Sequence, residues 1–122
     1  MLIRNLWPAF VWTLFILVLT LIPGSALPKV SFFQIDKIVH VFFFSVLMIL
    51  SSYGLRRISN NQSFSINPLF IACIYCVGLG ILIEVLQLLV PGRDFSFVDI
   101  LADTVGMGLG YLAFIFLRKE SN

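Results

Sequence analysis

Hydrophobic residues fill four long stretches of the chain, and short polar or turn-forming segments separate them. The stretches cover residues 6–22, 38–54, 69–90 and 96–117. Each is close to the roughly 20 apolar residues that a helix needs to cross the hydrocarbon core of a bilayer. The pattern therefore predicts an all-α membrane protein, a four-helix transmembrane bundle. Turn-forming pairs such as Pro23-Gly24 and Pro91-Gly92 mark where the first and third helices end.

The composition excludes a soluble globule. The chain is 60% hydrophobic and only 11% charged, with a mean hydropathy of +1.05, whereas a soluble domain carries about 25% charged residues. We expect residues 1–122 to form a single transmembrane domain, a multi-pass protein of the cell membrane with membrane lipids as its surroundings. The net charge of +2 is too small to suggest a nucleic-acid partner.

The N-terminal stretch also has features of a secretory signal, because Arg4 precedes it and the small residues Gly24-Ser25-Ala26 follow it. A typical signal core has about 7 to 15 apolar residues, and this stretch is longer. An uncleaved first helix is therefore favoured, with cleavage after Ala26 as the alternative.

The distribution of basic residues predicts the orientation. Five of them lie beside one set of helix ends and three beside the other: Arg4, Arg56, Arg57, Arg118 and Lys119 against Lys29, Lys37 and Arg93. The richer side is expected to be cytoplasmic under the positive-inside rule. Both termini and the polar connection 56–67 would then be cytoplasmic, and segments 23–36 and 91–95 would face outward.

Three short polar sets interrupt the apolar stretches near the ends predicted to face outward. They are Asp36 with His40, Glu84 with Gln87, and Arg93 with Asp99 and Asp103. Residues three or four apart share a helix face, so each set lines up along its helix. Counted from the outer turn, Glu84 and Asp103 lie about 10 Å down their helices. His40 would lie about 6 Å down, and Gln87 and Asp99 would be shallower.

Two glycines continue the acidic face of the last helix. Gly106 and Gly110 follow Asp103 in steps of three and four residues and form a G-x-x-x-G pair. Such a pair allows the backbones of two membrane helices to approach closely. The shared face of these glycines and the acidic residues is therefore expected to point into the bundle.

The polar residues have two interpretations. In the first, they serve only to cross-link the helices, and each pair stabilises the bundle by about 0.6 kcal/mol. An ionisable group inside a membrane costs about 2.5 to 3.5 kcal/mol on insertion scales, and such groups usually mark functional sites. The larger cost favours a functional site, which we expect to contain all seven residues of the polar sets.

Specific chemistry is less well defined by the sequence. His40 and Glu84 are the candidates for acid–base catalysis, and whether the protein is an enzyme stays open. The chain has one histidine and lacks H-x-x-x-H or E-x-x-H spacing, so we predict neither a metal nor a cofactor.

The ordered motifs together resemble the VanZ-like family of bacterial membrane proteins. They are Leu21-Ile22-Pro23, Asp36-Lys37-x-x-His40-x-x-x-Phe44, Glu84-x-x-Gln87, Pro91-Gly92-Arg93, Asp99 and Gly106. The family is named after an accessory glycopeptide-resistance protein linked to teicoplanin. The resemblance implies a membrane location and a site at these residues, but no defined molecular activity. It also leads us to expect Asn where this chain has Asp103.

Three functions remain open at this stage. The leading one is a cell-envelope protein whose outer-leaflet pocket binds the headgroup of a lipid-linked precursor or a glycopeptide, with a link to teicoplanin-type resistance. The second is an integral-membrane hydrolase or transferase that uses His40 and Glu84. The third is a structural or assembly subunit. The oligomeric state is not predicted.

Overall fold

The computed structural model describes residues 2–26, 32–62 and 65–121. It contains four α-helices, α1 (Leu2–Thr20), α2 (Phe32–Asn61), α3 (Pro68–Gln87) and α4 (Phe97–Glu120), and a short 3-10 helix, η1 (Gly24–Ala26). All four α-helices are long and apolar enough to cross a membrane. The predicted all-α fold with four transmembrane helices is confirmed.

The predicted helix boundaries were wrong by several residues in two places. α2 begins at Phe32 and runs to Asn61, so the predicted stretch 38–54 was too short at both ends and part of the predicted connection 56–67 is helical. Lysine, arginine and glutamine are good helix formers, but an apolar pattern does not count them. α3 ends at Gln87, because the amides of Leu88 to Val90 bond three residues back in successive turns.

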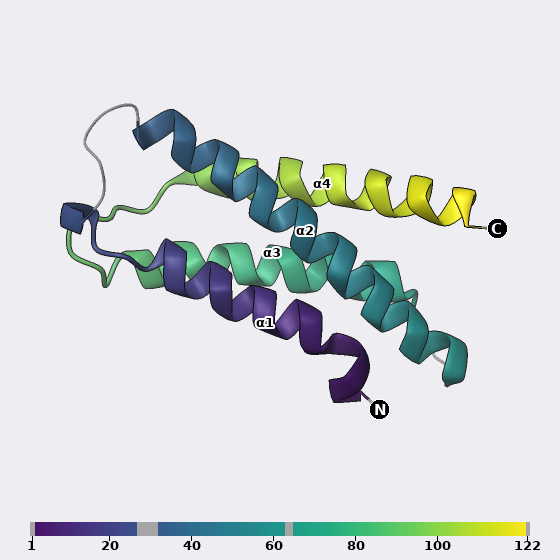
Figure 1. Cartoon of the computed structure of the whole chain (residues 1–122). Helices are drawn as coiled ribbons and strands as arrows, with labels where there is room; N and C mark the ends of the chain where they lie inside the picture. The colour runs from purple at the N-terminus through teal and green to yellow at the C-terminus, as the bar shows by residue number, and fades with distance from the viewer. Residues whose placement is uncertain (1, 27–31, 63–64, 122) are drawn as a thin grey trace.

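The helices alternate in direction, so the start of α1 and the end of α4 lie at the same end of the bundle (Figure 1). η1 and the turn between α3 and α4 lie at the opposite end. There the Gly24 amide donates to the Pro91 carbonyl at 3.0 Å. A β-carbon on Gly24 would overlap the Gly92 carbonyl, which explains a glycine at this contact. The membrane side on which each end lies stays a prediction.

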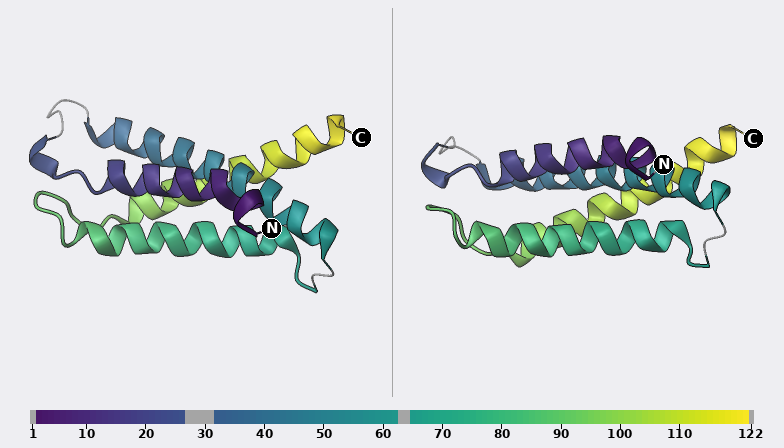
Figure 2. Two further views of the ribbon diagram at one scale, coloured as in Figure 1. Left: turned by 60° about the horizontal axis from the view of Figure 1, so that its bottom comes forward. Right: turned by 90° about the horizontal axis from the view of Figure 1, so that it is seen from below.

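α2 is the central helix and contacts each of the other three (Figure 2). Its most extensive contact is with α4, which runs parallel to it. A β-carbon on Gly106 would overlap the Val41 carbonyl oxygen, and one on Gly110 would overlap that of Ser45. The Ser45 hydroxyl lies 2.8 Å from the Gly106 carbonyl and forms a hydrogen bond between the helices. Both glycines therefore lie where the two backbones meet.

α1 packs against α2 and α3 as part of the same bundle. The Trp12 indole donates to the Phe43 carbonyl at 2.9 Å, the Thr13 and Tyr75 hydroxyls form a hydrogen bond, and Ile16 is completely buried in the core. Cleavage after Ala26 would remove these contacts.

The outer surface of the bundle is apolar. On α4, Leu101 is 63% exposed and Val105 is 56% exposed, while Asp99, Asp103 and Gly106 on the other face are buried. A helix that buries its acidic residues and exposes its leucines suits a lipid environment and not water. The polar site therefore lies inside the bundle.

Candidate functional site

The predicted polar residues converge at the end of the bundle that carries η1 and the turn between α3 and α4. Five of them, His40, Glu84, Gln87, Asp99 and Asp103, are buried with 6% exposure or less. Asp36 and Arg93 are partly buried. All seven predicted residues thus occupy the same region, although the individual contacts differ from those that the spacing suggested.

His40 and Asp103 form the most direct contact of the site. The Nδ1 atom of His40 lies 2.8 Å from Oδ1 of Asp103. Because α2 begins at Phe32, His40 lies about 12 Å down its helix, close to the roughly 9 Å depth of Asp103 on the parallel helix α4. The predicted depth of His40 was too shallow because the predicted helix began too late. An ionised carboxylate only accepts hydrogen bonds, so with Asp103 ionised Nδ1 donates, and a neutral ring would then keep its lone pair on Nε2.

Asp36 lies one turn above His40 on α2. Its Oδ1 atom is 3.8 Å from His40 Nε2 and 3.9 Å from a terminal nitrogen of Arg93. Asp99, in the first turn of α4, belongs to the same group: one oxygen from each aspartate and one nitrogen of His40 all lie within 4.8 Å of one another. The start of α2 and the start of α4 therefore present two carboxylates and an imidazole to a common point.

Glu84 is bonded to the backbone at the start of α4. Its Oε2 atom accepts a hydrogen bond from the Ser96 amide at 2.8 Å. The Ser96 hydroxyl in turn accepts from the Asp99 amide at 3.3 Å and caps the helix. Glu84 also interacts electrostatically with Asp99, His40 and Asp103. It thus fixes the start of the helix that carries both aspartates.

Gln87 and Arg93 bind the last carbonyl groups of the first membrane segment. The Gln87 amide donates to the Thr20 carbonyl at 2.9 Å, and Arg93 Nε donates to the Ile22 carbonyl at 3.1 Å. Carbonyls at a helix C-terminus have no partner within the helix. These two side chains supply partners and hold α1 against the other helices.

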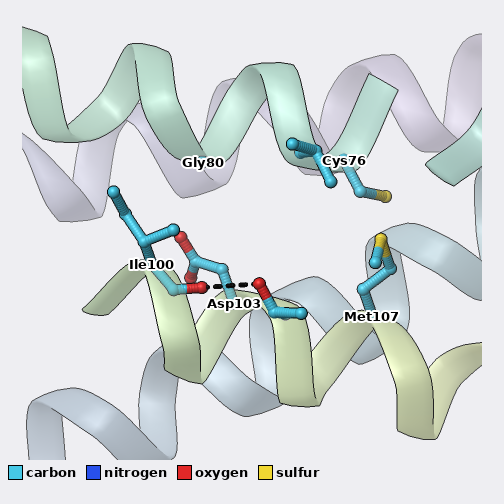
Figure 3. Close-up of a pocket in the computed structure, with 7 residues that line it drawn as sticks. Cys76, Gly80, Ile100, Asp103 and Met107 are labelled. Carbon is cyan, nitrogen blue, oxygen red and sulfur yellow. Dashed lines mark hydrogen bonds between the residues drawn. The ribbon is translucent and has the colours of Figure 1, made fainter. Parts of the chain in front are cut away.

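Three buried polar atoms of the site have no hydrogen-bond partner among the described residues. They are His40 Nε2, Glu84 Oε1 and Asp103 Oδ2. A β-carbon on Gly80 would lie 2.8 Å from Asp103 Oδ2. Asp103 and Gly80 also line a cavity of about 20 Å³ between α3 and α4 (Figure 3), about enough for one water molecule. Gly80 therefore leaves room for the carboxylate on the neighbouring helix.

A larger cavity opens on the other side of His40. Its volume is about 170 Å³. Its polar lining comes from Thr20, Asp36, His40 and Arg93, and its apolar lining from Leu19, Ile22, Ile35, Val39 and Phe43. Charged groups and membrane-facing side chains thus border the same space.

A comparison with protein families shows which family the chain belongs to. The family model described as VanZ/LLP1 matches residues 2–118, nearly the whole chain. The chain belongs to the VanZ/LLP1 family. The resemblance inferred from the ordered motifs is therefore confirmed. No curated protein and no solved structure matches the chain.

Some contacts of this VanZ-family site were not predicted from the sequence. The carbonyls of Thr20 and Ile22 and the amide of Ser96 are backbone groups, which any residue type supplies, so no residue pattern marks them. Gly80 was missed because its role appears only where α3 faces Asp103. The turn at Pro91-Gly92 was the signal that could have placed Glu84 near Ser96, since a short turn brings the two helix ends together.

Proposed function

We propose that this VanZ-family protein is a multi-pass protein of the bacterial cell membrane that binds the polar headgroup of a lipid-linked cell-wall precursor in the outer leaflet. The observation that carries the proposal is the cavity of about 170 Å³ where Asp36, His40 and Arg93 meet beside apolar side chains. An amphiphilic ligand needs both kinds of lining, one for its headgroup and one for the start of its chain.

The size of the cavity favours a headgroup over a whole glycopeptide. A cavity of this size holds several water molecules and suits a phosphate with part of a sugar. Ile35 lies at its edge with 53% of its surface exposed. This apolar residue would contact the lipid chain of the bound ligand where the chain extends out of the cavity. The link to teicoplanin-type resistance is suggested only by the family name.

The charges around the cavity suggest how a headgroup would be oriented. The guanidinium of Arg93 would face the phosphate, as arginine does at many phosphate sites. Asp36 and His40 would accept or donate hydrogen bonds to hydroxyl or amide groups of the sugar. The side chains of Asp36 and His40 would be held in place by the remaining residues of the site, Asp99, Asp103, Glu84 and Gln87.

Native mass spectrometry of the protein in lipid nanodiscs would test the proposal. The probes are a polyprenyl-pyrophosphate-linked disaccharide, polyprenyl monophosphate, teicoplanin, and phosphatidylglycerol as an ordinary anionic lipid. We expect selective retention of the polyprenyl ligands and a loss of at least tenfold in affinity in Arg93→Gln. Arg57→Gln, at the other end of the bundle, is the matched control. Equal retention of phosphatidylglycerol, or equal binding by both variants, would contradict a specific headgroup site.

An integral-membrane hydrolase or transferase is the second candidate, and the contact of His40 with Asp103 favours it. A carboxylate on Nδ1 orients the ring so that Nε2 can act as a general base. The pairing differs from the earlier assignment of His40 with Glu84, because Glu84 is bonded to Ser96. The same mass spectra distinguish the two functions, since turnover would convert the bound ligand into a product of different mass.

A further inference from the structure

We propose that Asp36, His40 and Asp99 bind one divalent transition-metal ion, with Asp103 as the residue that positions the histidine. The inference shares Asp36 and His40 with the proposed headgroup cavity, but its test measures metal binding and does not depend on headgroup binding. The sequence spacing did not suggest it, because the three residues come from two helices and form no short ligand motif.

The arrangement of the three ligands carries the first part of the argument. One side-chain atom from each lies within 4.8 Å of the others. Nitrogen and oxygen ligands of zinc lie about 2.0 to 2.2 Å from the metal, so they are roughly 3.4 Å apart around a tetrahedral ion. Closing the group needs movements of about 1 Å, and the Asp36 side chain, at 18% exposure, has room to move.

The state of His40 is the second, independent observation. His40 is 1% exposed, and its Nε2 has no hydrogen-bond partner among the described residues while it faces Asp36. A buried nitrogen without a partner is costly, and a metal ion would use its lone pair. Asp103 holds Nδ1 at 2.8 Å, as carboxylates do behind the histidine ligands of many metal sites.

The charges of the region agree with a cation. Asp36, Asp99 and Asp103 lie around a single histidine, and the guanidinium of Arg93 approaches Asp36. A divalent ion would offset the excess of negative charge. One imidazole with two carboxylates is a ligand set that zinc accepts, with a fourth position left for water or a ligand. Magnesium prefers oxygen ligands alone.

Zinc binding to the purified protein, without a polyhistidine tag and in a nonionic detergent, tests this proposal. A chromogenic chelator would compete for Zn²⁺, and Mg²⁺ would serve as the non-binding ion. The background variant carries Cys73→Ala and Cys76→Ala, so that neither thiol contributes. We expect one Zn²⁺ per chain, retained in Asp94→Asn, whose side chain lies in the exposed turn.

The variants of the site give the expected losses. His40→Gln and Asp99→Asn should lose the bound equivalent, while Asp103→Asn should keep it with affinity 10- to 100-fold lower. Asp36→Asn, at the edge of the bundle, provides a ligand variant that should fold if the buried ones do not. Far-ultraviolet circular dichroism and size exclusion report folding. No zinc binding by the background variant, or full binding by Asp36→Asn and His40→Gln, would overturn the proposal.

Discussion

His40 and Asp103 depend on each other for their hydrogen bonds. If Asp103 is replaced by alanine, the buried Nδ1–H of His40 loses its acceptor, at a cost of about 1 to 3 kcal/mol. An asparagine oxygen can still accept this hydrogen bond, and the family resemblance leads us to expect asparagine here. We therefore expect the melting temperature of Asp103→Asn in detergent to be close to that of the parent, and the melting temperature of Asp103→Ala to be clearly lower. Equal stability of the two variants would show that the hydrogen bond does not hold the helices together.

Glu84 offers a second test at this scale, because its role in folding and its charge can be separated. In Glu84→Gln the side-chain oxygen can still accept from the amide of Ser96, the residue that caps α4, so Ser96 should stay in place and the melting temperature should not fall. If the carboxylate is needed for function, ligand binding or cellular activity should be lost in this variant. Glu84→Ala is the control, with an expected loss of about 1 to 3 kcal/mol from the unpaired amide. Full activity in Glu84→Gln would assign Glu84 a structural role alone.

The sequence predicted which residues lie in the polar region better than it predicted the contacts between them. Counting residues inward from the predicted turns placed His40, Glu84 and Asp103 near one end of the bundle, and the spacing of three or four residues placed each set on one helix face. It did not predict that Gln87 and Arg93 bond to Thr20 and Ile22, because those acceptors are backbone carbonyls. Both side chains therefore have a structural task beside any role in a site.

At the level of elements, the apolar pattern identified all four long helices of the described residues but not where α2 begins. α2 begins at Phe32, before the residue from which the depth of His40 was counted, so the predicted depth was too shallow and the contact with Asp103 was not foreseen. The sequence also did not predict that α2 and α4 pack against each other. G-x-x-x-G indicates that some helix approaches closely, but the partner helix depends on the packing of the whole bundle.

Glycine substitutions in α4 test this close contact with a control on the same helix. A β-carbon on Gly106 would overlap the backbone of Val41, whereas one on Gly108 would meet nothing within 4 Å. Gly106→Ala should separate α2 from α4 and cost about 1 to 3 kcal/mol, as overpacking does. Gly108→Ala should melt at the parent temperature or higher, because alanine favours helix by about 1 kcal/mol. Unchanged melting of Gly106→Ala would show that α2 and α4 are not in close contact.

At the level of the whole molecule, helix length and charge agree on how the bundle sits in a bilayer. α1 and α3 have 19 and 20 residues, which gives about 28 to 30 Å and matches the hydrocarbon core. α2 and α4 are longer. Arg56 and Arg57 lie five and four residues before the end of α2, and Arg118 and Lys119 lie in the last turn of α4. Basic side chains there can reach lipid headgroups and favour a cytoplasmic location for this end.

The orientation decides which leaflet the polar site faces, so it also decides which ligands can reach the site. Asn61, the exposed last residue of α2, should be cytoplasmic, and Ser25, exposed in η1 near the site, should face outward. We expect a membrane-impermeant maleimide to label Ser25→Cys in intact cells and Asn61→Cys only after permeabilisation, both in a background with Cys73→Ala and Cys76→Ala. The reverse labelling pattern would place the His40 region in the cytoplasmic leaflet. A precursor exposed only on the outer surface could not then be its ligand.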